Sequence, residues 1–77
     1  MAAPASPDPA LAAALRELRG ERDLTQEELA HAAGLTVTAL ARIERAQANP
    51  TWATVRRIAA ALNVSLADLG AAVERAE

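Results

Sequence analysis

The sequence contains no cysteine and no lysine, and it has a single histidine. Without cysteine, disulfide bonds and thiolate metal sites are excluded, and one histidine cannot by itself form a metal cluster or a histidine relay. The serines, the histidine and the carboxylates form no convergent set, so we expect no catalytic residues, no metal site and no cofactor. The absence of cysteine is compatible with a reducing cytoplasm, which is the location that we expect.

Long hydrophobic runs are also absent. The longest apolar stretches are rich in alanine and are interrupted by charge well before the roughly 20 residues that span a bilayer. The N-terminus lacks a basic segment followed by an apolar block, so we expect no export and no membrane association. Prolines at positions 4, 7 and 9 indicate a flexible N-terminal arm over residues 1–7, followed by one domain over residues 8–77.

Net charge is −2, which is unpromising for a partner as negative as DNA, but the charge is unevenly distributed. Residues 1–35 carry −3 and residues 58–77 carry −2, whereas residues 36–57 carry +3. The charged residues of this middle segment are Arg42, Arg45, Arg56, Arg57 and Glu44. Because exposed charges more than about 8 Å apart are largely screened, the middle segment can present a basic face on an acidic protein.

Helix signals follow one another nearly to the end of the chain, and nothing alternates like a strand. The expected N-caps are Asp8, Thr25, Thr36, Thr51 and Ser65. Apolar residues recur after each cap at helical spacing, and this periodicity predicts a buried face in every helix. The residues expected to point inward in the first four helices are Leu11, Leu15, Leu18, Leu29, Ala30, Ala33, Leu40, Ile43, Trp52, Val55, Ile58, Ala59 and Leu62. The apolar residues that the last helix presents are Leu66, Leu69 and Val73. We therefore predict an all-α bundle of five helices.

The second and third helices are separated by a very short turn at Gly34. Glycine closes a helix in the left-handed conformation without a Cβ clash, and Thr36 can cap a new helix two residues later. Two helices joined in this way form a helix-turn-helix, whose second helix fits the major groove of DNA over about residues 36–45. The residues expected to face outward on it are Val37, Thr38, Ala41, Arg42 and Arg45.

The chain resembles the lambda-repressor-like, Cro/C1-type (XRE) helix-turn-helix proteins over about seven-tenths of its length. The matching segments are LTQEELA, AGLT, LARIER, NPTW and RRIAAALNVSL, in the family's order and spacing. Two positions depart from the family, because Asp23 and Ala46 stand where glycine is usual. At Ala46 we expect the helix either to continue or to accept about 1 kcal/mol of left-handed strain.

The resemblance implies roles for residues of this sequence. It implies that Val37, Thr38 and Arg42 contact bases. It implies that Gln26, Thr36, Arg45, Gln47 and Asn49 lie at the DNA backbone. It also implies a structural ion pair between Arg19 and Glu44. Three of these residues have alternative structural roles. Val37 could be a core residue, Thr36 is an N-cap before it is a phosphate contact, and Arg45 could complement the helix dipole.

We therefore predict a sequence-specific regulator of transcription, acting as a repressor on double-stranded DNA and associated with the nucleoid when bound. One short recognition helix reads a short site, so a homodimer is expected, with Leu66, Leu69 and Val73 as its interface. Closure of the monomer core is the alternative role of those three residues. Two rival functions are a protein-interaction module that has lost DNA binding and an antitoxin that binds a toxin as well as operator DNA.

Overall fold

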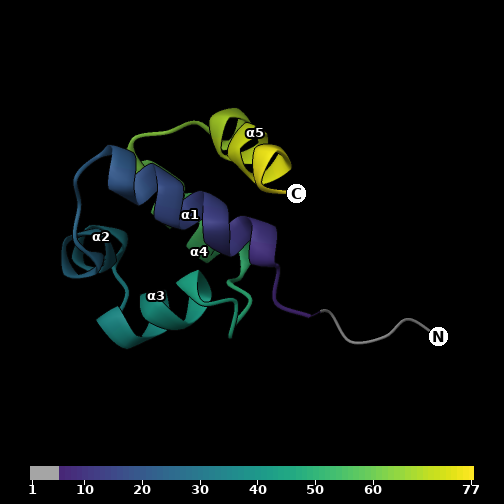
Figure 1. Ribbon diagram of the computed structural model, residues 1–77. Coiled ribbons are helices and arrows are strands. Elements are labelled where there is room, and N and C mark those ends of the chain that lie inside the picture. The colour runs from purple at the N-terminus through teal and green to yellow at the C-terminus, as the bar shows by residue number, and fades with distance from the viewer. Residues whose placement is uncertain (1–5) are drawn as a thin grey trace.

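The helices begin at the side-chain caps that the sequence predicts. The computed structural model describes residues 6–77, and this part of the chain forms α1 (Pro9–Glu21), α2 (Gln26–Ala33), α3 (Val37–Glu44), α4 (Trp52–Leu62) and α5 (Leu66–Ala76) (Figure 1). The caps Asp8, Thr25, Thr36, Thr51 and Ser65 each accept a hydrogen bond from a backbone N–H of the first turn. Thr25 and Glu28 form the reciprocal capping box. The predicted all-α fold of five helices is confirmed.

Three of the four connections between helices are built in the same way, and we call this unit the three-residue joint. It consists of a residue with positive φ, an apolar residue and the next helix cap. The three joints are Asp23-Leu24-Thr25, Gly34-Leu35-Thr36 and Asn63-Val64-Ser65, with φ of 53°, 71° and 57° at their first residues. In each, the N–H of the apolar residue donates to a carbonyl of the preceding helix at 2.8 to 3.2 Å. The Schellman motif thus closes one helix directly before the cap of the next.

The connection between α3 and α4 is longer. Ala46 ends α3 with φ of 56°, so the helix does not continue and the alanine accepts the left-handed conformation. The side chain of Asn49 then bonds to the start of the described chain: its Oδ1 accepts from the Asp8 N–H at 3.3 Å, and its Nδ2 donates to the Ser6 carbonyl at 3.1 Å. Residues 1–5 of the predicted arm lie outside the described residues.

α1 lies across the middle of the bundle, between α5 on one side and α3 on the other, while α2 packs against α3 and α4 (Figure 1). Fully buried leucines and an isoleucine fill the space between the helices. They are Leu15, Leu29, Leu40, Ile58 and Leu62. Leu24, Leu35 and Val64 of the three-residue joints pack against this core, which fixes the angles at which successive helices meet. Among the helices of residues 6–77, none is both long and apolar enough to cross a membrane.

Two of the predicted side-chain placements are wrong. Trp52 was expected in the core, but 64% of it is exposed, because position 52 is the first residue of α4 and lies beyond the apolar stripe that starts at Val55. Ala41 was expected to face outward, but it is only 6% exposed. The buried side of α3 is wider than the stripe of Leu40 and Ile43 because α3 packs against both α2 and α1.

Candidate nucleic-acid interface

α3 presents a mixed polar, basic and apolar surface to solvent. Val37, Thr38, Arg42 and Arg45 are all exposed, and we call these four residues the α3 face. Val37 is 39% exposed although it shares its helix with buried Leu40 and Ile43, so its core alternative is not the one that the fold adopts. The α3 face therefore offers an isopropyl group, a hydroxyl and two guanidinium groups on one short helix. These groups match the methyl, donor and acceptor groups that base pairs expose in a major groove.

Both arginines of the α3 face are available to an external anion. Within residues 6–77 the ion pairs are Arg19 with Glu44 and Arg22 with Glu21, and neither involves Arg42 or Arg45. Arg45 caps the end of α3, where its charge complements the helix dipole, but its side chain is exposed. The acidic residue of this helix, Glu44, is 1% exposed and faces the interior. The outward side of α3 is consequently more basic than its sequence suggests.

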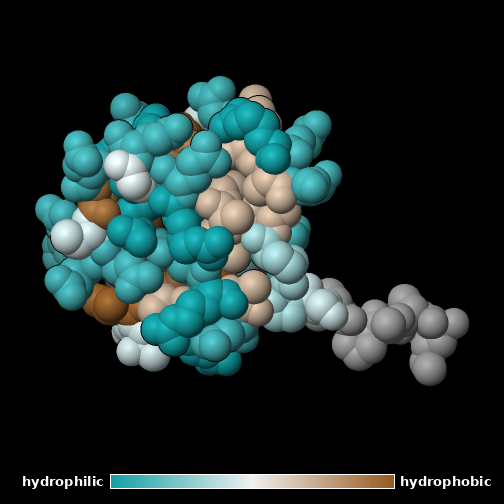
Figure 2. Space-filling model, viewed as in Figure 1, coloured by the Kyte–Doolittle hydropathy of each residue, from teal (hydrophilic) through white to brown (hydrophobic). Residues whose placement is uncertain are grey.

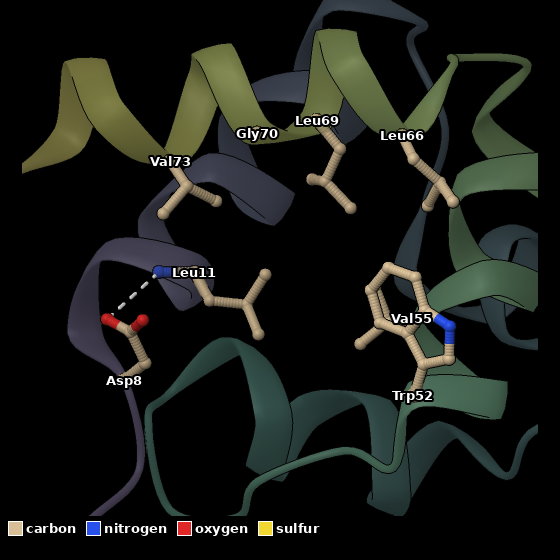
Figure 3. Close-up of a pocket in the computed structure, with 8 residues that line it drawn as sticks. All are labelled: Asp8, Leu11, Trp52, Val55, Leu66, Leu69, Gly70 and Val73. Atoms are coloured by element: carbon tan, nitrogen blue, oxygen red, sulfur yellow. Dashed lines mark hydrogen bonds between the residues drawn. The ribbon is translucent and has the colours of Figure 1, made fainter.

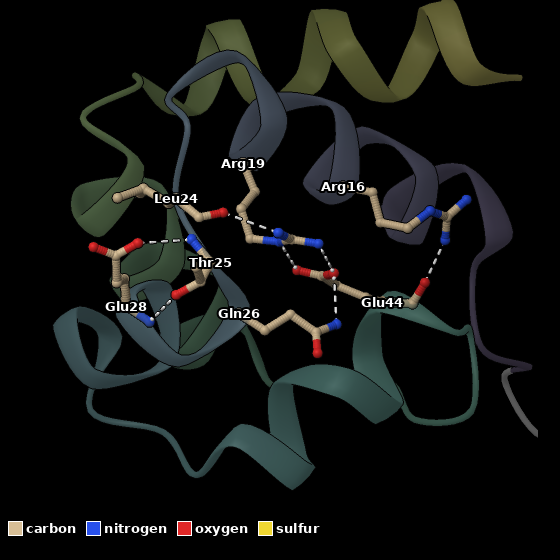
Figure 4. Close-up of polar contacts among 7 residues, drawn as sticks. All are labelled: Arg16, Arg19, Leu24, Thr25, Gln26, Glu28 and Glu44. Atoms are coloured by element: carbon tan, nitrogen blue, oxygen red, sulfur yellow. Dashed lines mark hydrogen bonds and ion pairs between the residues drawn. The ribbon is translucent and has the colours of Figure 1, made fainter.

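Glu44 is the centre of a polar network that joins three helices (Figure 4). Arg19 of α1 donates from Nε to Glu44 Oε2 at 2.9 Å and from Nη2 to Oε1 at 3.0 Å, so the ion pair that the resemblance implies is present. Gln26, the first residue of α2, donates from Nε2 to Glu44 Oε1 at 3.0 Å. Arg19 also donates to the Leu24 carbonyl at 2.9 Å, and Arg16 donates to the backbone carbonyl of Glu44.

The residues predicted to contact the DNA backbone differ in their exposure and in how many of their polar groups are already hydrogen-bonded. Thr36 is exposed, and its Oγ1 accepts the Ala39 N–H at 3.0 Å, which leaves its own hydroxyl proton free to donate. Gln47 is exposed beside the end of α3. Asn49 already uses one donor and one acceptor with Asp8 and Ser6, so only part of its amide remains for a phosphate. Gln26 is half-buried and bonded to Glu44.

An apolar groove of about 410 Å³ lies on another side of the molecule, where the start of α1, the start of α4 and α5 meet. It is lined by Asp8, Leu11, Trp52, Val55, Leu66, Leu69, Gly70 and Val73. Figure 3 shows the indole of Trp52 facing Leu66 across the groove, with Leu11 and Val73 farther along it. In Figure 2 an area of apolar residues lies where α5 meets the N-terminal end of α1, and smaller apolar areas lie elsewhere on the same face.

The three predicted interface residues of α5 differ in exposure. Leu69 is 4% exposed and belongs to the monomer core, which is the alternative role that the sequence left open. Val73 is half-buried, and Leu66 is 41% exposed. Trp52, predicted to lie in the core, is instead the largest exposed apolar side chain in the groove, where it neighbours Leu66. The exposed part of the groove is therefore formed chiefly by Trp52 and Leu66.

This arrangement of helices defines a class of protein. A family model described as helix-turn-helix matches residues 15–69, from the middle of α1 to the first turn of α5, and the chain belongs to that family. A sequence relative is the HTH-type transcriptional regulator DdrOP3 of Deinococcus deserti, which is 38% identical over 60 residues. The match covers 78% of this chain and 46% of the relative, so the chain spans about half the length of that protein.

Solved structures of bacterial regulators share the fold. The clp gene regulator ClgR from Corynebacterium glutamicum matches with a TM-score of 0.82 and 30% sequence identity, and the match covers 87% of each chain. The restriction-modification controller protein C.Esp1396I, solved as a tetramer in complex with its natural 35 base-pair operator, matches with a TM-score of 0.84 and 26% identity. That match covers 88% of this chain and 90% of the controller protein.

Proposed function

We propose that this chain binds specific double-stranded DNA as a regulator of transcription, acts as a repressor by occluding a promoter, and inserts α3 into the major groove as a homodimer. The observation that carries the proposal is the α3 face, where two arginines without ion-pair partners and an exposed valine and threonine project from a helix whose one carboxylate is buried. Membership of the helix-turn-helix family and the operator complex of C.Esp1396I support it. A DNA-bound regulator of this kind acts in the cytoplasm, on the nucleoid.

Each predicted contact has a separate task in this proposal. Val37, Thr38 and Arg42 read base edges, with Arg42 suited to the two acceptors of guanine and Val37 to a thymine methyl. Thr36, Arg45, Gln47 and the free part of the Asn49 amide contact the DNA backbone and fix the orientation of α3. Gln26 contributes at the N-terminus of α2, where free N–H groups and the helix dipole favour a phosphate.

The first test is the salt dependence of binding to a duplex selected from a random pool. A dimer that neutralises roughly two to four phosphates should show a slope of log K against log salt of about −2 to −4. Arg45→Ala removes one cation per protomer and should make the slope shallower by about 2 for the dimer. Arg75→Ala removes the same charge from the last turn of α5 and should leave the slope unchanged. Duplex binding without salt dependence, or no duplex binding, would favour a protein-interaction module.

The apolar groove is the surface that we assign to the second copy of the chain. A symmetric dimer places the same patch of both protomers together, and Trp52 and Leu66 supply exposed apolar area at a surface separate from the α3 face. Two recognition helices can then reach half-sites about 34 Å apart. The tetramer formed by C.Esp1396I on its operator is an example of assembly in a protein of this fold.

Leu66→Asp should dissociate the dimer while the monomer stays folded. Burying two unpaired carboxylates at a dimer interface costs several kcal/mol, so we expect the dimer dissociation constant to rise at least about a hundredfold. An aspartate in the first turn of α5 interacts favourably with the helix dipole. The thermal stability of the monomer should therefore change little. Sedimentation measures the assembly, and the fluorescence of Trp52, the single tryptophan, reports burial of the groove.

Ala67→Asp is the matched control, because Ala67 is exposed in the same turn but does not line the groove. It should leave the dimer and the fluorescence unchanged. If Leu66→Asp has no more effect on assembly than Ala67→Asp, the dimer uses another surface.

A further inference from the structure

Glu44 is the single charged or polar residue that is buried within residues 6–77, with 1% of its surface exposed. Its carboxylate receives three N–H groups: two from Arg19 and one from Gln26. A buried carboxylate is stable only when it is paired and its oxygens are hydrogen-bonded, and here both conditions are met. Arg19 balances the charge, so the bond to Gln26 is not needed for neutrality. That bond calls for a different explanation.

The bond determines how the amide of Gln26 is oriented. A carboxylate can only accept hydrogen bonds, so the NH₂ group of Gln26 must face Glu44 and the carbonyl oxygen must face away. One of the two N–H groups is used at 3.0 Å, and the other remains available as a donor. Figure 4 shows the Gln26 side chain extending from the first residue of α2 to the carboxylate at the end of α3. A side chain with three rotatable bonds is thereby held in one conformation before any ligand arrives.

We propose that Glu44 is a positioning residue that orients Gln26 for contact with a DNA phosphate and ties that contact to the placement of α3. This inference rests on the proposed function, in which Gln26 lies at the DNA backbone. Because Glu44 is the last residue of α3, its carboxylate fixes the phosphate-contacting end of α2 relative to the helix that reads the bases. Holding Gln26 in the free protein removes much of the ordering cost that a long side chain would otherwise add to binding.

The bond itself can be tested in the free wild-type protein by NMR. The chain has two glutamines and two asparagines, so only four side-chain amide pairs appear in the spectrum. Gln47 is exposed and serves as an internal control for Gln26. We expect the side-chain amide proton of Gln26 that is bonded to Glu44 to exchange with solvent at least about fivefold more slowly than those of Gln47. Equal exchange rates would mean that Glu44 does not hold the amide, and the inference would be wrong.

The consequence for DNA is tested by a double-mutant cycle on affinity for the selected duplex. Glu44→Asp keeps the negative charge beside Arg19 but withdraws the carboxylate from Gln26 by one methylene. We expect it to weaken binding about fivefold in the wild-type background and by less than about twofold in a Gln26→Ala background. Glu44→Gln replaces the carboxylate, which only accepts hydrogen bonds, with an amide that both donates and accepts and so does not fix the orientation of Gln26. It should weaken binding in the same way, provided that circular dichroism shows a folded protein. A purely structural role would weaken binding equally in both backgrounds.

The cycle separates failure of this inference from failure of the proposed function. Gln26→Ala alone should weaken binding to preferred and unrelated duplexes by a similar factor, because a phosphate contact carries no sequence information. If Gln26→Ala leaves binding to every duplex unchanged, the phosphate role of Gln26 is wrong and the positioning role is wrong with it. If Gln26→Ala weakens binding but the Glu44 variants are simply additive with it, the positioning role alone is wrong.

Discussion

Arg42→Ala is expected to weaken binding to the preferred duplex by about 1–3 kcal/mol, which is roughly five- to 150-fold in affinity, and to relax selectivity at one base pair. Arg42 is exposed on α3, and no carboxylate pairs with it in the described structure, so its guanidinium enters a groove without first breaking an ion pair. The bidentate match of guanidinium to guanine accounts for both effects. Affinities for the selected duplex and for its single-base variants, at one fixed salt concentration, measure them.

Arg75→Ala is the control for this experiment. Arg75 is exposed in the last turn of α5, which lies across α1 from α3 (Figure 1), and its removal changes the net charge equally. It should alter neither affinity nor base preference by more than about 0.5 kcal/mol. If Arg42→Ala weakens all duplexes uniformly, Arg42 contacts phosphate rather than a base. If both variants behave alike, α3 is not the helix that enters the groove.

Arg19→Ala is expected to lower the free energy of unfolding by about 3 kcal/mol. Removing one partner of a buried pair leaves an uncompensated charge, and Glu44 would retain only the neutral Gln26 donor. The side chain of Arg19 is 21% exposed, which admits some water and places the expected value at the low end of the range for such pairs. The bond from Arg19 to the Leu24 carbonyl is lost as well, so α1 loses contacts with both α3 and the first three-residue joint. Urea denaturation measures the change.

Two further variants test the cause of that loss. Glu21→Ala removes the ion pair of Arg22 and Glu21, whose side chains are 36% and 52% exposed, and it should cost less than about 1 kcal/mol. Arg19→Met combined with Glu44→Leu replaces both buried partners with apolar groups and should recover most of the stability lost in Arg19→Ala. A loss in Arg19→Ala no larger than that in Glu21→Ala would mean that Glu44 becomes hydrated without cost.

Local signals in the sequence were sufficient to predict the helices. Each cap is a short side chain whose bond closes within three residues, as with Thr36 and the Ala39 N–H. Trp52 shows the limit of such reasoning: helical periodicity gives the direction of a side chain but not whether a neighbouring element reaches it. Ala41 shows the converse, because a second packing partner widened the buried side of α3. Both errors arise from the arrangement of helices rather than from the helices themselves.

The sequence predicted which residues of the candidate site face outward on α3, but it did not predict the hydrogen bonds of Gln26 and Asn49. The outward placement of Val37, Thr38 and Arg42 follows from the spacing of the buried residues on the same helix. The bond between Gln26 and Glu44 joins residues 18 positions apart, and the bonds of Asn49 join residues more than 40 positions apart, so neither has a local signal. In the sequence, the short turn at Gly34 indicates a helix-turn-helix. The same joint occurs at Asp23 and Asn63, so its position before a basic helix distinguishes it.

The three-residue joints also bear on the rate at which this protein engages a target. Each joint already bonds carbonyl groups at a helix end and an N–H group in the first turn of the next helix, so the chain from α1 to the end of α3 is ordered before contact. The entropic cost of association then falls on side chains such as Arg42 rather than on the backbone. The association rate would then depend on diffusion, on the relative orientation of the two molecules and on electrostatic steering. No slow refolding step would limit it.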